Sequence, residues 1–337
     1  MDLIQFYKPT LNRKDMDAVL QTMVDEKIGP GEKKKEFENL FLTLTEKDNC
    51  ISLRTYLDAL EIALKIAGCK KGSRVGVSVI SPSIYSLVAE RLSVELVLID
   101  IDSENCCLDY EKAIAKDCEI LLVHEAFGSL PINDGFLENS PVIIEDISQS
   151  LGSNYNNFSA GHISDIVVSS FEENNMVSTA GGAIVAVNGK EKSDLLAEFN
   201  LNYREMTDLN ASLGIIQLKK FNERQSRRKE IFKVYQNSLL KTKHKLFGLM
   251  NIDFENTGSG FCVLLNSKPE DVIKFALKYQ VPCRRSFASC VGKDRFQDFD
   301  SFPIGSVYIM RAVDFPLYPY LTRDEIEAIS RVIAHMP

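Results

Sequence analysis

Short apolar runs that alternate with helical patterns constrain the fold of this chain more than any other feature of its sequence. Several of these runs are apolar at every position, which is typical of strands that are covered on both faces. Their alternation with helices predicts a mainly parallel, doubly wound α/β sheet with helices on both sides. The predicted strands are Val75–Ile80, Leu96–Asp100, Ile120–Val123, Val142–Asp146, Ile166–Ser170 and Ala183–Val187.

Apolar residues at helical spacing place the predicted helices around these strands. They are expected at Asp15 to about Glu26, around Phe37–Phe41, at about 54–67 and near Ile84–Leu92. A long helical pattern from Asp208 to about Leu240 is interpreted as a bridge between a large α/β domain at 1–235 and a small α+β domain at 236–337. The small domain is predicted to hold strands at Gly260–Leu265 and Val307–Arg311, a helix at Pro269–Tyr279, and a last helix that begins with a Thr322–Glu325 capping box.

The composition argues against several classes of protein. With 45% hydrophobic and 26% charged residues over 337 positions, the chain is of ordinary globular type and long enough for a sizeable core. A net charge of −8 argues against nucleic acid as a partner. The main basic cluster, Arg224, Arg227, Arg228 and Lys229, falls in a helical pattern and is interpreted as a solvated helix face. No apolar run approaches the ~20 residues of a membrane span, so no membrane partner is expected.

The eight cysteines form no CxxC pair, and their spacings do not match a zinc site, so no metal is predicted. Several lie in apolar segments, where buried free thiols are expected. Free thiols fit a reducing compartment, and the N-terminus shows no secretory signal. A cytoplasmic location is therefore expected.

Polar residues follow directly after several of the predicted strands. Asp100, His124, Asp146 and Ser170 each stand at or just past a strand end. Ligands of doubly wound sheets bind outside the carboxyl ends of the strands, so these residues are candidates for a site. Asp and Ser are also common turn and cap residues, and that reading stays open for Asp146 and Ser170.

The segment Glu145–Gly152 resembles the Glu-Asp-x-x-Gln-x-x-Gly segment of the DegT/DnrJ/EryC1/StrS family. Its members are sugar aminotransferases that depend on pyridoxal phosphate (PLP) and have the fold-type I transferase fold. Further stretches with a family-like pattern follow in the family's order: Ile28–Gly31 with Glu36–Glu38, Ala59–Leu64, Val97–Asp102, Val123–Gly128, Asn202–Asp208 and Phe315–Pro319 with Leu321–Thr322. The resemblance covers almost the whole chain. It implies a large doubly wound domain with a smaller C-terminal domain, and a place in polysaccharide or glycoconjugate biosynthesis.

The resemblance also implies a role for particular residues. Asp146 matches the carboxylate that keeps the PLP pyridine nitrogen protonated, and Gln149 matches a residue that packs on the ring or hydrogen-bonds to it. Ser170 matches a contact to the cofactor phosphate. Asn202 matches a phosphate contact made across a subunit boundary, so the resemblance implies a homodimer.

The loop between Ser170 and Gly182 departs from the family. It holds only polar side chains around its centre, which predicts a loop that crosses a pocket. In the family this loop carries the lysine that forms the Schiff base with PLP. Here that position falls on Asn175, and neither Asn174 nor Met176 supplies a lysine if the register shifts by one. Because an amide neither forms a Schiff base nor takes a proton at neutral pH, no catalytic residue is assigned.

A second departure lies at the start of the helix near residues 57–67. The family has Ser-Gly-Thr there, where small residues let backbone N–H groups approach the phosphate. The corresponding residues are Thr55, Tyr56 and Leu57, and the larger side chains are expected to fill the phosphate cradle.

These departures leave three hypotheses. The first is a non-catalytic family member, a homodimer that binds a nucleotide-sugar or a partner protein. The second is an enzyme that binds PLP or its amine form (PMP) noncovalently and uses another base, such as Glu172 or Glu173, as in a sugar dehydratase. Family dehydratases carry a histidine at the lysine position, which this loop lacks. The third is an ordinary aminotransferase whose lysine was changed by design.

Overall fold

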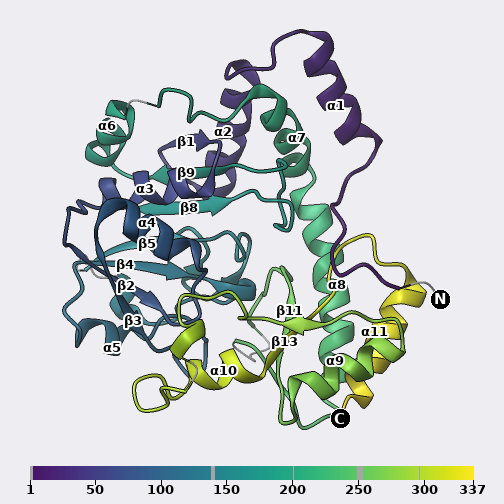
Figure 1. The fold of residues 1–337 in the computed structure, drawn as a ribbon. Helices are drawn as coiled ribbons and strands as arrows, with labels where there is room; N and C mark the ends of the chain where they lie inside the picture. The colour runs from purple at the N-terminus through teal and green to yellow at the C-terminus, as the bar shows by residue number, and fades with distance from the viewer. Residues whose placement is uncertain (1–2, 138–140, 200, 249–252, 296) are drawn as a thin grey trace.

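Two β-sheets and the helices around them make up the computed structural model, which describes residues 3–137, 141–199, 201–248, 253–295 and 297–337. In Figure 1 the larger sheet lies across the upper and left part of the molecule, and the smaller sheet lies at the lower right. Helix α8 (Phe221–Leu239) runs from one part to the other along the right-hand side. The predicted bridge between the two parts is therefore helical.

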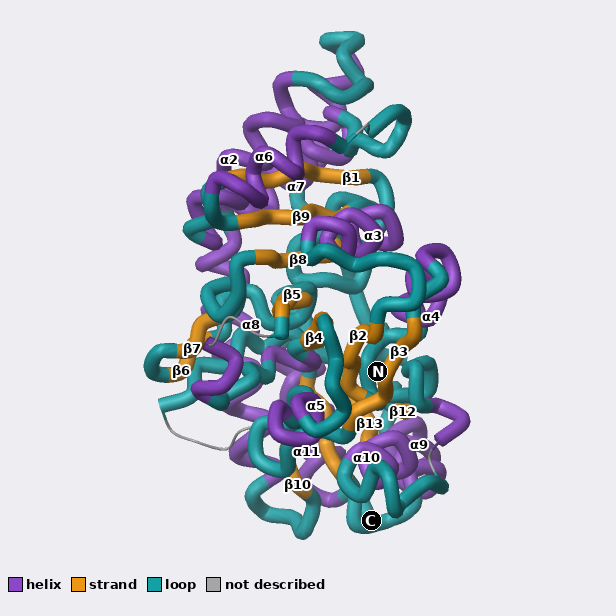
Figure 2. The backbone as a smooth tube through the Cα atoms, turned by 90° about the vertical axis from the view of Figure 1, so that its left-hand side faces the viewer, coloured by secondary structure: helices purple, strands orange, loops and turns teal. Residues whose placement is uncertain are grey.

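The large sheet has seven strands in the order β1-β9-β8-β5-β4-β2-β3, a ladder that Figure 2 shows from the side. The pairs among β8, β5, β4, β2 and β3 are parallel, whereas β9 pairs antiparallel with β8 and with β1. The mainly parallel sheet that the sequence predicts is thus confirmed. The strands are β1 (Asn49–Leu53), β2 (Arg74–Ser78), β3 (Glu95–Ile99), β4 (Ile120–His124), β5 (Val142–Asp146), β8 (Ile166–Ser170) and β9 (Ala183–Val187).

Both faces of this sheet are buried, and neighbouring residues of a strand enter different cores. Ile143 and Val167 pack into the cluster that holds Phe37 and Phe41 of α2. Ile144 and Val168 pack into the cluster on the other face. This explains why the strands are apolar at every position. The helices around the sheet are α1 (Arg13–Val24), α2 (Glu32–Thr45), α3 (Tyr56–Ile66), α4 (Ile84–Leu92), α5 (Tyr110–Ile114), α6 (Lys190–Glu198) and α7 (Asp208–Lys219).

The C-terminal part is built on a four-stranded antiparallel sheet in the order β10-β11-β13-β12. Its core joins residues of α8 to the last helix, for example Tyr235 to Ile329, and it includes Ile4 from the N-terminal stretch. Its elements are β10 (Lys245–Leu246), β11 (Phe261–Leu264), α9 (Pro269–Lys278), β12 (Arg284–Arg285), α10 (Gly305–Arg311), β13 (Ala312–Phe315) and α11 (Arg323–His335). The predicted capping box at the start of α11 is present. A two-stranded ribbon, β6 (Asn154–Tyr155) with β7 (Phe158–Ser159), stands apart from both sheets.

Several sequence-based expectations are wrong in detail. The segment Val307–Arg311 is part of helix α10 instead of a strand, and the strand follows it as β13. The helix predicted at Asp208–Leu240 is two helices, which meet at Lys220. Strand β1 was not predicted at all.

The prediction of a solvated basic face on α8 is wrong for two of its four residues, whereas Arg227 and Lys229 are partly exposed. Arg224 and Arg228 are buried. Arg224 pairs with Asp15 at 3.1 Å, and an Nη1 donor of Arg228 lies 2.9 Å from the carbonyl oxygen of Leu317. These two cations therefore join elements of the fold instead of facing solvent. None of the described helices has both the length and the apolar character needed to cross a membrane.

Candidate functional site

Three neighbouring strands bring the candidate residues to one edge of the large sheet. Strands β4, β5 and β8 are adjacent and parallel, and they end at His124, Asp146 and Ser170. His124 stands directly opposite Asp146 in the register of β4 and β5. The sheet topology therefore gathers residues that are far apart in the sequence, as expected for the carboxyl edge of such a sheet.

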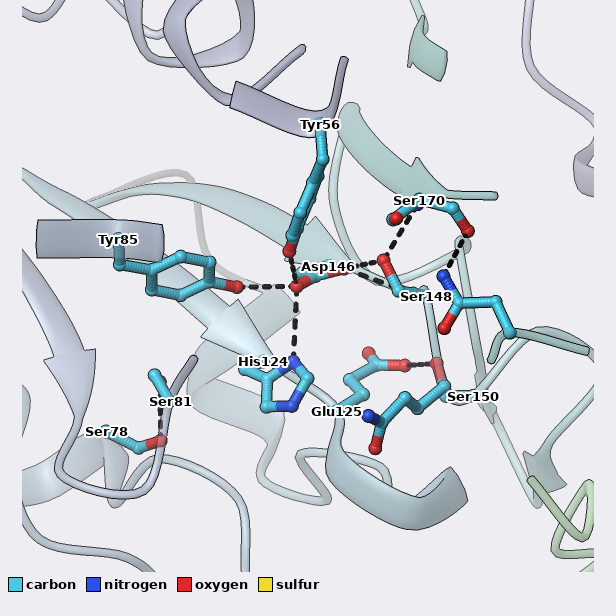
Figure 3. A network of polar contacts seen from close by, with 12 residues as sticks. Tyr56, Ser78, Ser81, Tyr85, His124, Glu125, Asp146, Ser148, Ser150 and Ser170 are labelled. Atoms are coloured by element: carbon cyan, nitrogen blue, oxygen red, sulfur yellow. Dashed lines mark hydrogen bonds and ion pairs between the residues drawn. The ribbon is translucent and has the colours of Figure 1, made fainter. Parts of the chain in front are cut away.

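The carboxylate of Asp146 is fully buried and accepts hydrogen bonds from five donors (Figure 3). Its Oδ2 accepts from the hydroxyls of Tyr56 and Tyr85, the latter at 2.6 Å, and lies 3.1 Å from Nδ1 of His124. Its Oδ1 accepts from the backbone N–H of Ser148 at 3.1 Å and from the Ser148 hydroxyl at 2.5 Å. A carboxylate offers about four lone-pair positions, so these donors occupy its accepting capacity.

This arrangement fixes the proton positions around Asp146. Because an ionised carboxylate only accepts hydrogen bonds, Nδ1 of His124 carries a proton. Burial alone would raise the pKa of Asp146. Hydrogen bonding and the charge of His124, with the hydroxyls of Ser148 and Tyr56, hold the pKa below its ordinary value.

The pKa values of Tyr56 and Tyr85 shift in the direction opposite to that of Asp146. Burial and the neighbouring charge of Asp146 raise the pKa of Tyr56 and that of Tyr85 well above the usual value. Both phenols therefore keep their protons at neutral pH and act as hydrogen-bond donors to Asp146.

A chain of contacts leads from Asp146 to the loop that lacks the lysine. The hydroxyl of Ser148 accepts from the backbone N–H of Ser170 at 2.8 Å. The carbonyl oxygen of Ser170 accepts from the side-chain amide of Asn175 at 2.7 Å. Asn175 therefore holds the loop against the end of β8. This loop joins two antiparallel neighbours, β8 and β9, and its residues Asn174, Asn175 and Met176 line a cavity.

The first turn of α3 contains a carboxylate, that of Asp58. The Thr55 hydroxyl accepts from the backbone N–H of Asp58 at 3.1 Å and lies 2.6 Å from an Asp58 carboxylate oxygen. Asp58 also pairs with Arg91 at 3.4 Å and with Arg204 at 3.7 Å. The helix N-terminus that would attract a phosphate is therefore already capped by Thr55 and faced by a carboxylate.

Two further acids, Glu145 and Glu125, are buried near Asp146. Glu145 is buried and accepts from three backbone N–H groups, those of Gly161, Ile163 and Ser164 at 2.8–3.0 Å. Glu125 is also buried, and one of its oxygens accepts from the hydroxyl of Ser150 (Figure 3). Burial and the charge of Glu145 raise the pKa of Glu125 well above its usual range. Glu125 therefore holds a proton where an exposed glutamate would not.

A cavity of about 240 Å³ opens in front of the strand ends. Its wall combines the N-terminal stretch (Phe6, Tyr7), the end of β4 (His124), the turn after β5 (Gln149) and the C-terminal sheet (Arg284, Asp314). Tyr7 closes one side, where its hydroxyl lies 3.4 Å from the backbone oxygen of Asn175. Neither Asp146, Tyr56 nor Ser170 lines this cavity.

The remaining predicted site residues lie apart from Asp146. Gln149 lines the cavity, and its Oε1 accepts from the backbone N–H of Phe127 at 2.9 Å. Asn202 lies on an exposed turn between α6 and α7 and does not line the cavity. The structure thus joins Tyr56, Asp146 and Ser170 in one network, with Thr55 next to it as a helix cap.

Sequence reasoning missed Tyr85 and Ser148 and gave His124 no partner. Ser148 could have been found, because a serine two residues after a strand-end aspartate can bond back to its carboxylate. The contact of Tyr85, in the first turn of α4, depends on how α4 packs and leaves no local signal.

The described side chains do not fit PLP held in the way that the family resemblance implies. A pyridine N–H needs a free oxygen of Asp146, and both oxygens are engaged by protein donors. The start of α3 faces its own carboxylate instead of a vacant anion site. The described part of the chain also contains no group of three His, Cys, Asp or Glu residues that could hold a metal ion.

Comparison with known proteins places this geometry in context. In the solved structures, the chain is similar to the aminotransferase TlmJ from Streptoalloteichus hindustanus, with a TM-score of 0.87, 18% identity and 98% of each chain covered. It is also similar to the PLP form of Spr1654 from Streptococcus pneumoniae, with a TM-score of 0.88, 18% identity, and 98% of this chain and 97% of that chain covered. The expected fold-type I PLP-dependent transferase fold is therefore confirmed.

The sequence comparisons agree. The spore coat polysaccharide biosynthesis protein SpsC of Bacillus subtilis (strain 168) is 22% identical, with 96% of this chain and 95% of that protein covered. The GDP-perosamine synthase of Escherichia coli O157:H7 is 24% identical over 71% of this chain and 72% of its own. The profile of the DegT/DnrJ/EryC1/StrS aminotransferase family matches residues 9–334. Because that match spans nearly the whole chain, the protein belongs to the DegT/DnrJ/EryC1/StrS aminotransferase family.

Proposed function

We propose that this protein is a member of its family that neither binds PLP at Asp146 nor transfers amino groups. The observation that carries the proposal is the hydrogen bond from the Tyr56 hydroxyl to Oδ2 of Asp146, an oxygen that the Tyr85 hydroxyl and Nδ1 of His124 also contact. Tyr56 begins α3, where the family resemblance places the phosphate, and its hydroxyl ends at the carboxylate that would face the pyridine nitrogen. The tyrosine side chain therefore lies along the space that the cofactor would need.

The other departure supports the same proposal. At the position matched to the Schiff-base lysine, the side-chain amide of Asn175 donates a hydrogen bond to the Ser170 carbonyl oxygen. An amide so engaged offers neither a nucleophile nor a base to a substrate.

The cavity in front of the strand ends gives the protein a place to bind a ligand without reacting with it. Its polar lining is mostly uncharged and includes Gln149, Asn174, Ser259, Ser286 and Ser289. Such amides and hydroxyls suit the hydroxyl groups of a sugar. We propose a nucleotide-sugar as the ligand, with the sugar in the cavity, in keeping with the GDP-linked sugar named for the Escherichia coli relative. A partner protein at the same face is the other occupant we consider.

The test is a titration of the purified protein with PLP. We expect no aldimine absorbance, no shift in the melting temperature, and no adduct on residues 171–182 after borohydride reduction and mass spectrometry. The matched variant combines Tyr56→Gly with Asn175→Lys, which frees Asp146 and restores the amine. If the double variant binds PLP and the natural protein does not, the proposal is supported.

Other outcomes favour the remaining hypotheses. PLP or PMP that binds without an aldimine, and that shifts the melting temperature, would favour a cofactor-dependent sugar-modifying enzyme such as a dehydratase. His124 lines the cavity and is the group best placed to move a proton in that case. Full aminotransferase activity of Asn175→Lys alone would favour a lysine lost by design, because Tyr56 would then be no obstacle.

We also propose that the protein is a homodimer. Helix α1 turns a row of apolar side chains to solvent, Met16, Leu20 and Met23, each more than half exposed. The opposite side of the same helix buries Asp15 and Thr22. Asn202, which matches a contact across the subunit boundary, is on the exposed surface as that role requires.

We propose a cytoplasmic location as well. All eight cysteines are free thiols, which supports a place in the reducing cytoplasm.

A further inference from the structure

A second cavity, of about 700 Å³, lies in the C-terminal part of the molecule. It is formed by the start of α9, strand β12, the end of α10 and the segment between β12 and α10. Its volume falls within the roughly 300–1,000 Å³ of small-molecule sites, whereas the cavity at the strand ends is smaller. Phe287, which is buried, lines both cavities, so the two cavities are neighbours.

The charged side chains that line the second cavity are all cationic. Four cationic side chains line it, Lys268, Arg285, Lys293 and Arg311, and among the described residues no carboxylate does. This contrasts with the net charge of −8 for the whole chain. Like charges gathered in one hollow repel one another, and an anionic ligand would relieve that repulsion.

Three of the four cations remain available for a ligand. Arg285 is engaged, by the Glu270 carboxylate and by the backbone oxygen of Met310 at 3.2 Å. Within the described ranges, the structure contains no ion pair for the side chains of Lys268, Lys293 and Arg311. All three are exposed, so a ligand can reach them without rearrangement of the fold.

We propose that this second cavity binds a small organic phosphate, recognised through a diphosphate group by Lys293, Arg311 and Lys268. Guanidinium and ammonium groups form charge-assisted hydrogen bonds with phosphate oxygens, and arginine can make two in parallel. Ile309 and Met310 add an apolar wall, against which the rest of such a molecule would pack. This site is separate from Asp146, and the proposal does not depend on whether the protein binds PLP there.

Calorimetric titration of the natural protein with inorganic diphosphate and with UDP tests the proposal. We expect both to bind, more weakly as ionic strength rises, because salt screens exposed charges. The variant Lys293→Gln with Arg311→Gln should bind at least about tenfold more weakly, since charge-assisted hydrogen bonds are lost. Tighter binding of UDP than of diphosphate would assign part of the affinity to the apolar wall; equal binding would assign it to the diphosphate alone.

The matched control is Lys278→Gln with Arg331→Gln, which removes the same charge from exposed positions outside the cavity. Its affinity should equal that of the natural protein. The proposal fails if neither compound binds at low ionic strength, or if both double variants lose affinity equally. Circular dichroism of each variant separates loss of the site from loss of the fold.

Discussion

At the scale of single residues, the most informative contact is that of Tyr56 with Asp146. The sequence indicates that a tyrosine replaces a glycine at the start of α3, and that the residue is too large for a phosphate cradle. The structure adds where the side chain goes, to a carboxylate 90 positions away. Local patterns cannot give such a contact, because it depends on how α3 packs against β8 and β9 of the large sheet.

Removal of the Tyr56 hydroxyl should destabilise the fold. In Tyr56→Phe, the buried Asp146 loses one charge-assisted donor but keeps those of Tyr85, His124 and Ser148. We expect the free energy of unfolding to fall by about 1–2 kcal/mol. Urea denaturation measures it, with Tyr320→Phe, a more exposed tyrosine, as the control. An unchanged midpoint would mean that the contact adds nothing to stability.

The buried acid pair predicts a pH dependence. Because burial raises the pKa of Glu125, the folded protein keeps a proton that the unfolded chain releases above the ordinary value of 4.5. The folded state then binds more protons, so this contribution to stability falls as pH rises from there. Glu125→Gln keeps the shape and cannot titrate.

The stability of Glu125→Gln relative to the natural protein should therefore increase with pH, by up to about 1.4 kcal/mol per pH unit for one proton. Urea denaturation between about pH 5 and 8 measures this difference. Glu223→Gln, on the exposed side of α8, should show no such trend. A difference that stays flat with pH would contradict a raised pKa for Glu125.

At the scale of elements, one carboxylate joins two helices. Asp208, in the first turn of α7, is buried and accepts from the backbone N–H groups of Gly31, Lys33 and Lys34 at 2.8–3.1 Å. These groups begin α2, whose N-cap residue, Gly31, has no side chain to serve them. Asp208 therefore caps α2 from another element.

Asp208→Ala should leave these three donors without their acceptor. We expect a loss of about 2 kcal/mol or more in the free energy of unfolding. Thermal and urea denaturation provide the measurement. Asp17→Ala removes an exposed carboxylate from α1 and should change stability by less than about 0.5 kcal/mol. Equal effects of the two variants would show that Asp208 is no cap.

The elements also show what a sequence can predict. Strands β4, β5 and β8 are predictable from the sequence because each is an apolar run whose side chains pack into the cores on both faces of the sheet. The strand prediction for Val307–Arg311 is wrong because a valine, a tyrosine and an isoleucine favour a strand locally, whereas the structure has a helix there whose Tyr308 and Ile309 pack with Phe247 and Phe302. The break at Lys220 lacks a glycine or proline, so nothing in the sequence marks it.

At the scale of the whole molecule, the candidate site depends on three distant parts of the chain. The cavity takes Tyr7 from the N-terminal stretch, His124 from the large sheet and Arg284 from the C-terminal sheet. A sequence can predict the strand-end residues of the site, because ligands of parallel sheets generally bind at the carboxyl ends of the strands. It does not indicate Tyr7 or Arg284, because they reach the cavity only through the tertiary packing of distant parts of the chain.

The apolar side of α1 leads to the last prediction, which concerns assembly. The sequence predicts an amphipathic helix with Met16, Leu20 and Met23 on one side, and such a side is normally buried. In the single chain it is exposed, while Asp15 on the other side is buried against Arg224. Burial of leucine and methionine side chains is worth about 1.5–3 kcal/mol each, so a second copy of the chain would be stabilised by covering them.

Sedimentation velocity should therefore give twice the chain mass of 37.9 kDa for the natural protein. Leu20→Glu with Met23→Glu places two charges in the proposed interface and should shift the protein to the single-chain mass, because an unpaired charge is costly to bury. Leu240→Glu, at an exposed leucine after α8, should leave the dimer intact. A natural protein that sediments as a monomer would remove the dimer, and with it the proposed role of Asn202 across the subunit boundary.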